Sequence, residues 1–196
     1  MKTLYIYLLF YLIHFTGQYK LIKYGSSKNI KNLKQLPDLL LDNLPYYPNL
    51  VKYMDIILIM FFIPLVLSNN FVDDTILFFK FFSIILVLRL LTSFATLIPP
   101  IKCRYKKSRS SIKKPINYLT GHNYDKIFSG HTSMILILIM IYYNKKIISK
   151  NKCFILFIFN IIYSFLILIT RQHYSVDVIL AYIITIPYFY LLKNYV

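Results

Sequence analysis

The chain combines an apolar composition with a strong positive charge. Its 196 residues are 58% hydrophobic, with a mean hydropathy of +0.57, and 23 Lys and Arg against 7 acidic residues give a net charge of +16. Soluble domains rarely combine these properties, so we expect apolar spans within a membrane and basic loops outside it. Nucleic-acid binding is disfavoured, because basic residues in such loops lie nearest to lipid headgroups.

Six apolar stretches predict an all-α, polytopic membrane protein, a bundle of about six transmembrane helices in one domain over residues 1–196. Each is near or below the roughly 20 residues that a membrane-spanning helix needs. The stretches are residues 4–16, 53–68, 75–100, 132–143, 153–170 and 176–192. No small-residue cleavage site follows the first, which favours a membrane anchor over a removed signal peptide. Pro64 and Pro187 lie inside spans, where we expect kinks.

A count of membrane crossings brings the most unusual segments to one face. From His131 the chain crosses once, turns at residues 144–152, and returns through the next span to reach His173. The same parity puts residues 35–42 and 99–128 on that face. Segments that are far apart in sequence are therefore expected to meet at one membrane surface.

The first of these segments carries two acids. Asp38 and Asp42 are four residues apart and precede Tyr46 and Tyr47. Such a pair can receive the cationic amine of a lipid headgroup, with cation–π support from the aromatic rings. An amphipathic helix at the membrane surface explains the same pattern, and without further support we prefer that interpretation.

A single arginine interrupts the third apolar stretch. Arg89 is expected to face the interior of the bundle, because a charge at that depth needs an acid or a phosphate as its partner. Two interpretations stay open: a structural ion pair, for example with Asp55, and direct contact with a substrate.

The sequence Ser129-Gly130-His131-Thr132 lies where the fourth span begins. Gly130 permits close approach of an anion to the backbone, and the helix N-terminus offers unpaired N–H groups and a positive dipole end. His131 would then lie beside a bound phosphate and shuttle a proton. A histidine that only caps a helix at the interface is the structural alternative.

His173 and Asp177 lie four residues apart at the start of the last span. On a helix they share a face, and an Asp that holds one imidazole nitrogen orients the other as a nucleophile or base. Arg171 adds a fork of N–H donors for phosphate oxygens. A purely structural His–Asp pair is disfavoured, because an acid that opens an apolar span is costly and suggests function.

The remaining histidines and acids indicate no metal site. His14 is expected to be packed in the first span, and His122 precedes Asp125 in a loop that can lie near the site. The chain has no H-x-x-x-H motif and no cysteine pair, which disfavours zinc. Its acids do not cluster as a magnesium or calcium site requires. We therefore expect no metal and no cofactor.

Together these residues resemble the sphingomyelin synthase family, a branch of the type-2 phosphatidate phosphatase-like superfamily. The resemblance covers roughly residues 35–185. Four family motifs recur in order. The segment Gln35-Leu36-Pro37-Asp38 through Asp42 is similar to PLPDxxxD, and Arg89-x-x-Thr92-Ser93-x-x-Thr96-x-x-Pro99 is similar to RxxTMxxTxxP. The segment Asp125-x-x-x-Ser129-Gly130-His131-Thr132 is similar to CGDxxxSGHT, and His173-Tyr174-Ser175-x-Asp177-Val178-x-x-Ala181-Tyr182-x-x-Thr185 is similar to HYTxDVxxAYxxT. The last two motifs are the most specific.

The resemblance implies transfer of a phosphobase headgroup, phosphocholine first, from a glycerophospholipid to ceramide. His173 would attack phosphorus and form a phosphohistidine-type intermediate, which Asp177 stabilises. His131 would protonate the departing diacylglycerol and later deprotonate the ceramide hydroxyl. Substrate-binding roles are expected for Arg171, Arg89, Asp125, Ser129, Gly130, Asp38, Asp42 and Tyr174.

Departures from the family motifs leave the headgroup and the acceptor lipid, ceramide or diacylglycerol, open. The substituted positions are Gln35 for Pro, Ser93 for Met, Ser175 for Thr, and Asn123-Tyr124 for Cys-Gly. The general phosphatase signature KxxxxxxRP is absent, since the chain has no Arg-Pro, which favours the synthase branch. The alternatives are a lipid phosphate phosphatase acting on phosphatidate-like lipids and a non-enzymatic lipid-binding or scrambling protein.

Charge and resemblance disagree on orientation. Most Lys and Arg lie on the presumed active face, which by the positive-inside rule points to the cytosol. The resemblance implies a lumenal or extracellular active site, in the endoplasmic reticulum, Golgi or plasma membrane. We favour the second orientation, because many of these charges lie in longer loops, where the rule has less weight.

Overall fold

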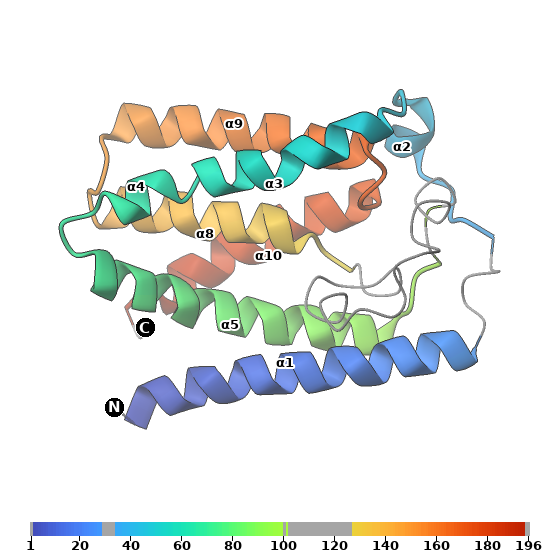
Figure 1. Cartoon of the computed structure of the whole chain (residues 1–196), viewed down its shortest axis with the longest axis horizontal. Helices are drawn as coiled ribbons and strands as arrows, with labels where there is room; N and C mark the ends of the chain where they lie inside the picture. The colour runs from blue at the N-terminus through green and yellow to red at the C-terminus, as the bar shows by residue number, and fades with distance from the viewer. Residues whose placement is uncertain (1, 29–33, 100, 102–126, 195–196) are drawn as a thin grey trace.

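The computed structural model describes residues 2–28, 34–99, 101 and 127–194, which form a bundle of helices (Figure 1). The helices are α1 (Lys2–Ser27), α2 (Leu39–Asn43), α3 (Val51–Met60), α4 (Ile63–Val66), α5 (Phe71–Ala95), α8 (Gly130–Asn144), α9 (Lys150–Ile169) and α10 (Ser175–Leu192), with a 3₁₀ turn at Pro48–Leu50. The described part of the chain contains no strand. The predicted class is confirmed: this is a polytopic helical membrane protein.

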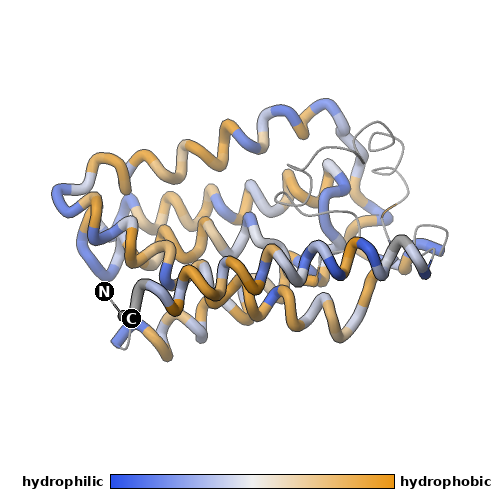
Figure 2. The backbone as a smooth tube through the Cα atoms, turned by 60° about the horizontal axis from the view of Figure 1, so that its bottom comes forward, coloured by the Kyte–Doolittle hydropathy of each residue, from blue (hydrophilic) through white to orange (hydrophobic). Residues whose placement is uncertain are grey.

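The six predicted stretches correspond to α1, α3 together with α4 (the α3–α4 rod), α5, α8, α9 and α10. Among the described helical segments, four are long and apolar enough to cross a membrane: Pro48–Val66, α5, α9 and α10. α8 is apolar but has only 15 residues, about 22 Å at 1.5 Å per residue. α1 is longer than predicted, with 26 residues, but does not reach the apolarity of the four. Hydrophobic residues dominate most of the rods (Figure 2).

The α3–α4 rod is interrupted, as Pro64 predicted. This proline lies in the first turn of α4, directly after the break, because proline has no N–H and its ring clashes with the carbonyl one turn earlier. The Phe61 carbonyl at the break accepts a 2.6 Å hydrogen bond from the Tyr142 hydroxyl. A polar group inside the bundle is thereby satisfied, as lipid surroundings require. α10 runs through Pro187 as one helix.

α8 lies at the centre of the bundle, packed against α5, α9 and α10 (Figure 1). Its side chains are buried without interruption from Ile135 to Tyr142, which suits a helix that is apolar all round. The outer helices instead expose large apolar side chains, including Ile59, Phe154 and Ile183. Such faces are suited to lipid tails, which are as apolar as these side chains.

α1 packs along α5 at the edge of the bundle (Figure 1). The two helices approach closely at Gly17, where an added Cβ would overlap the Leu90 side chain and force it to move. His14 is buried in the same interface, with Nδ1 2.9 Å from the Leu86 carbonyl oxygen. The prediction that His14 is packed is therefore confirmed.

Candidate active site

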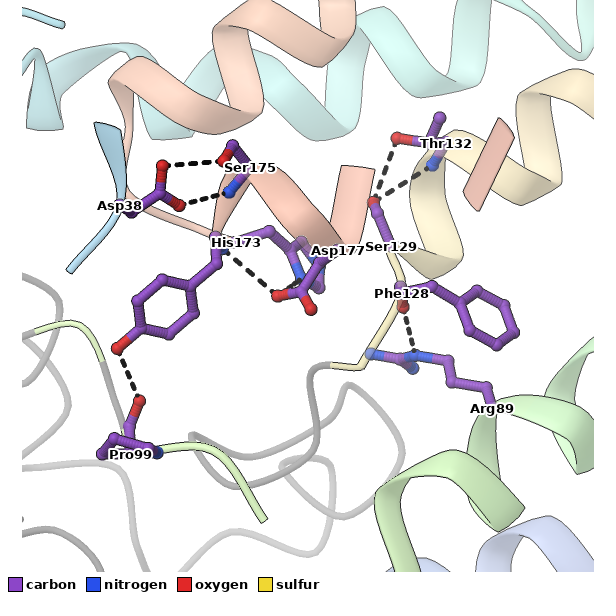
Figure 3. A network of polar contacts seen from close by, with 10 residues as sticks. Asp38, Arg89, Pro99, Phe128, Ser129, Thr132, His173, Ser175 and Asp177 are labelled. Carbon is purple, nitrogen blue, oxygen red and sulfur yellow. Dashed lines mark hydrogen bonds and ion pairs between the residues drawn. The ribbon is translucent and has the colours of Figure 1, made fainter. Parts of the chain in front are cut away.

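The turn between α9 and α10 carries the predicted His–Asp pair (Figure 3). Asp177 lies in the first turn of α10 and His173 just before that helix. Nδ1 of His173 is 3.4 Å from Oδ2 of Asp177. Both residues are buried, with 4% of His173 and 0% of Asp177 exposed. The contact that the sequence predicted is therefore present, although His173 lies before the helix and not on it.

Asp177 also orders the start of α10. Its Oδ2 accepts a second hydrogen bond, from the Tyr174 amide at 3.2 Å, and a carboxylate in this position is favoured by the helix dipole. Its other oxygen, Oδ1, is buried and has no hydrogen-bond partner among the residues that the structure describes. A buried acceptor without a donor is costly, so Oδ1 can accept a bond from a group that enters the site.

The start of α8 is bonded directly to this pair. The Ser129 amide donates to the backbone carbonyl of Asp177 at 2.8 Å. The Ser129 hydroxyl oxygen caps α8 by accepting bonds from the amide and the hydroxyl of Thr132, at 3.3 Å and 3.1 Å (Figure 3). His131, the second residue of α8, is half-buried. The two motifs that parity placed on one face therefore meet through a hydrogen bond.

Arg89 of α5 reaches the same point. Its Nε donates to the Phe128 carbonyl at 3.1 Å (Figure 3), and a Cβ built on Gly130 would lie 3.5 Å from its Nη1. The guanidinium therefore lies against the N-terminus of α8, whose dipole end is also positive. Two positive groups this close favour an anion between them, and phosphate oxygens suit both.

Asp38 caps two helices. Its Oδ1 accepts bonds from the Leu41 amide at 3.0 Å and the Ser175 hydroxyl at 2.7 Å, and its Oδ2 accepts from the Ser175 amide at 2.7 Å. Burial alone would raise the pKa of Asp38, but these hydrogen bonds outweigh it and lower the pKa below its ordinary value. Asp42 accepts from the Asp38 amide at 3.2 Å. This geometry favours the helical interpretation of the two acids over the headgroup interpretation.

Arg171 directs its guanidinium at the other end of α2. Nη1 donates to the Leu41 carbonyl, and Nη2 donates to the Leu44 carbonyl at 2.8 Å. These are carbonyls at the C-terminal end of a helix, which a cation stabilises. Arg171 also has a φ of 57°, which closes the turn after α9. Its predicted phosphate contact stays a prediction, beside this structural role.

Tyr174 joins two further segments to the site. Its hydroxyl donates to the Pro99 carbonyl at 2.9 Å and accepts from the Leu36 amide at 3.3 Å. The ring is buried, and this residue links the ends of two predicted motifs to the turn before α10. Asp125 and His122 lie outside the described residues.

Sequence reasoning missed the roles of Ser175 and Phe128. In the sequence Ser175 is only a departure from the family motif, yet its hydroxyl donates to Asp38 at 2.7 Å, and the Thr of that motif would supply the same group. Phe128 is fully buried with a φ of 44°. No sequence signal indicates this, because a bulky residue rarely adopts a left-handed backbone.

A comparison with known protein families finds a match that covers the site residues in the C-terminal part of the chain. Residues 124–195 match the family model described as PAP2 superfamily C-terminal. That segment contains both motifs that meet at Asp177. The match supports a relationship to the type-2 phosphatidate phosphatase-like superfamily and a lipid phosphatase- or phosphotransferase-like function, without distinguishing the sphingomyelin synthase branch. No curated protein matches the chain.

Proposed function

We propose that this chain is a single transmembrane catalytic domain that transfers a phosphobase headgroup, phosphocholine first, from a glycerophospholipid to ceramide. The coarser lipid phosphotransferase chemistry is supported by the match over residues 124–195. The transferase branch is supported by the resemblance of four motifs to the sphingomyelin synthase family and by the absence of an Arg-Pro signature.

One observation carries the proposal: the hydrogen bond that joins the Ser129 amide to Asp177, which in turn contacts His173. It brings a polarised histidine and a phosphate-binding helix terminus to the same place. A carboxylate acceptor selects the imidazole tautomer with its proton on Nδ1, so Nε2 carries the lone pair. That arrangement suits nucleophilic attack.

In the first step, Nε2 of His173 forms a bond to phosphorus, and the bond from phosphorus to the diacylglycerol oxygen breaks. His131 gives its proton to the departing oxygen. The carboxylate of Asp177 stabilises the positive charge that develops on the His173 ring. Arg89 and the amides at the start of α8 stabilise the charge on the phosphoryl oxygens.

In the second step, the ceramide hydroxyl attacks phosphorus and gives its proton to His131. The bond between His173 and phosphorus breaks, which restores both histidines. Buried surroundings favour ceramide over water at this stage, because His173 is almost inaccessible to solvent. From the family resemblance we infer that the active face lies in the lumen or outside the cell.

The test uses membranes from cells that express the chain, supplied with fluorescent ceramide and a panel of phospholipid donors. We expect a phosphosphingolipid product whose donor names the headgroup. His173→Gln should abolish it, whereas His14→Gln, a matched change in the α1–α5 interface, should leave it unchanged.

Two other outcomes would replace the proposal. Release of free phosphate from phosphatidate, without a ceramide product, would establish the phosphatase alternative, which the superfamily match also accommodates. Lipid movement across vesicles that persists in His173→Gln, with neither product formed, would establish a non-enzymatic lipid-binding or scrambling protein.

A further inference from the structure

The short helix α2 is bonded at both ends to the turn that carries His173. At its N-terminus, Asp38 holds the amide and hydroxyl of Ser175. At its C-terminus, the Arg171 guanidinium holds two carbonyls. A third bond follows, from the Tyr47 amide to the Ile169 carbonyl at 2.9 Å. α2 therefore spans the whole turn from α9 to α10.

Away from the turn, α2 exposes two leucines together with its polar residues Asp42 and Asn43. Leu39 and Leu40 are 82% and 47% exposed, and Leu36, one turn earlier, is 43% exposed, whereas Leu41 is fully buried. Leu36 precedes the helix, and Leu39 and Leu40 are its first two residues, so the exposed leucines gather around the N-terminal end of α2. Tyr47, beyond the helix, is also more than half exposed, and tyrosines gather where a membrane meets water.

The surroundings decide what covers these leucines. α2 lies at the end of the bundle where the chain enters α10 (Figure 1), beside helices whose outer faces are apolar. Leucines exposed to water would forfeit their transfer free energy. At the border between headgroups and acyl chains the same side chains are satisfied.

We propose that α2 is a lipid-facing splint: its outer leucines rest in the bilayer interface, while Asp38 and Arg171 hold the His173 turn in its reactive position. The positioning half rests on the proposed function, because it takes His173 as the nucleophile. Both oxygens of Asp38 are committed to protein donors, so Asp38 and Arg171 are positioning residues that act through Ser175 and the turn.

The lipid contact can be measured without any activity. The chain contains no Trp, so Leu39→Trp introduces a single tryptophan, excited selectively over the tyrosines, into protein reconstituted in vesicles that contain brominated phospholipid. Ile162→Trp, on the exposed face of α9, reports full lipid contact, and Lys145→Trp, in the loop after α8, reports water. We expect quenching of Leu39→Trp near that of Ile162→Trp. Quenching no stronger than that of Lys145→Trp would overturn the lipid face, and Leu40→Trp repeats the measurement independently.

The positioning role is tested at Ser175, which touches Asp38 without being a proposed reactive group. Ser175→Ala should lower kcat for headgroup transfer about 10-fold to 100-fold with little change in KM, as expected for a misplaced nucleophile. Ser175→Thr keeps the hydroxyl and should restore the rate. Asn43→Ala, which removes a bond within α2 alone, should leave kcat unchanged. Equal losses in Ser175→Ala and Asn43→Ala, a change in KM alone, or no recovery in Ser175→Thr would overturn the positioning role.

The lipid contact of α2 and its positioning role are tested independently, so either can fail without the other. If the wild-type protein transfers no headgroup, the proposed function is wrong, but fluorescence quenching still decides whether α2 contacts lipid. If transfer occurs and Ser175→Ala matches the wild-type rate, the proposed function stands and the splint is rejected.

Discussion

Two buried histidines occupy regions of this protein that differ in almost every other respect. His14 is 5% exposed and His173 is 4% exposed, and each is bonded through Nδ1. The partner of His14 is a neutral backbone carbonyl of α5, whereas the partner of His173 is the Asp177 carboxylate. A carboxylate stabilises a positive imidazole more strongly than a neutral carbonyl does, so burial alone does not identify a reactive histidine.

The surroundings widen the difference. Beside His14, the buried amide of Gln18 has no hydrogen-bond partner among the described residues, and α1 packs chiefly on α5. Around His173, segments from α2, α5, α8 and the loop at Pro99 converge through hydrogen bonds. Convergence of separate elements on one group therefore distinguishes the proposed active site from the α1–α5 interface.

Asp177→Asn should give the sharpest contrast between the two regions. An amide can hold the wrong tautomer of His173 and carries no charge, so the transfer rate should fall about 10⁴-fold. The initial rate is measured on purified protein in mixed micelles, with His14→Gln as the control. A rate within tenfold of wild type in Asp177→Asn would remove the distinction between the histidines.

Arg89→Ala is expected to give the next largest loss of activity. Loss of one preorganised group that stabilises phosphoryl charge costs about 10²–10³-fold in kcat, and Arg89→Lys should recover only part of it, because lysine lacks the fork of donors. Turnover is followed with a labelled headgroup donor. Full activity in Arg89→Ala would assign its bond with Phe128 a structural role only.

The contacts of the proposed active site could be predicted from the sequence where spacing and parity were sufficient. His173 and Asp177 touch, as their four-residue spacing predicted, and the Ser129 amide bonds to the Asp177 carbonyl, as the expected parity of the spans predicted. The sequence could not predict where Arg171 points. A guanidinium binds phosphates and helix carbonyls equally well, and the choice depends on the tertiary position of the five-residue α2.

The same limit explains two further gaps. The Asp38–Ser175 bond joins residues 137 positions apart, and no local pattern pairs them. The partner of Arg89 is a backbone carbonyl exposed by a left-handed phenylalanine, which residue type does not reveal. The break before Pro64 followed more directly, because proline acts locally.

Gln18→Met tests the region around His14, where we expect an effect on stability and not on activity. Met has a similar shape but no amide to satisfy, so the variant should be more stable by about 1–3 kcal/mol, the usual cost of a buried unpaired polar group. Thermal unfolding in detergent gives the stability, and the transfer rate should not change. A destabilised or inactive variant would show that α1 contributes a polar function.

Acid should affect the His173 region through Asp38, with the smallest effect of the set. Because folding lowers the pKa of Asp38, its ionised form stabilises the fold above the unfolded pKa of about 3.9, and this contribution is lost as pH falls through the lowered pKa. The difference in melting temperature between wild type and Asp38→Asn should be constant above about pH 5 and shrink below about pH 4. A difference that grows on acidification would contradict the assigned bonds.

The central claim, that His173 is the nucleophile, is tested most directly by trapping the intermediate. Purified protein is incubated with a phospholipid labelled in its phosphobase headgroup, without ceramide, then quenched in alkali, digested and examined by mass spectrometry. The account predicts label on the peptide that contains His173, absent from His173→Gln and chased into product by ceramide. Label on the His131 peptide, or headgroup transfer through no labelled histidine, would contradict it.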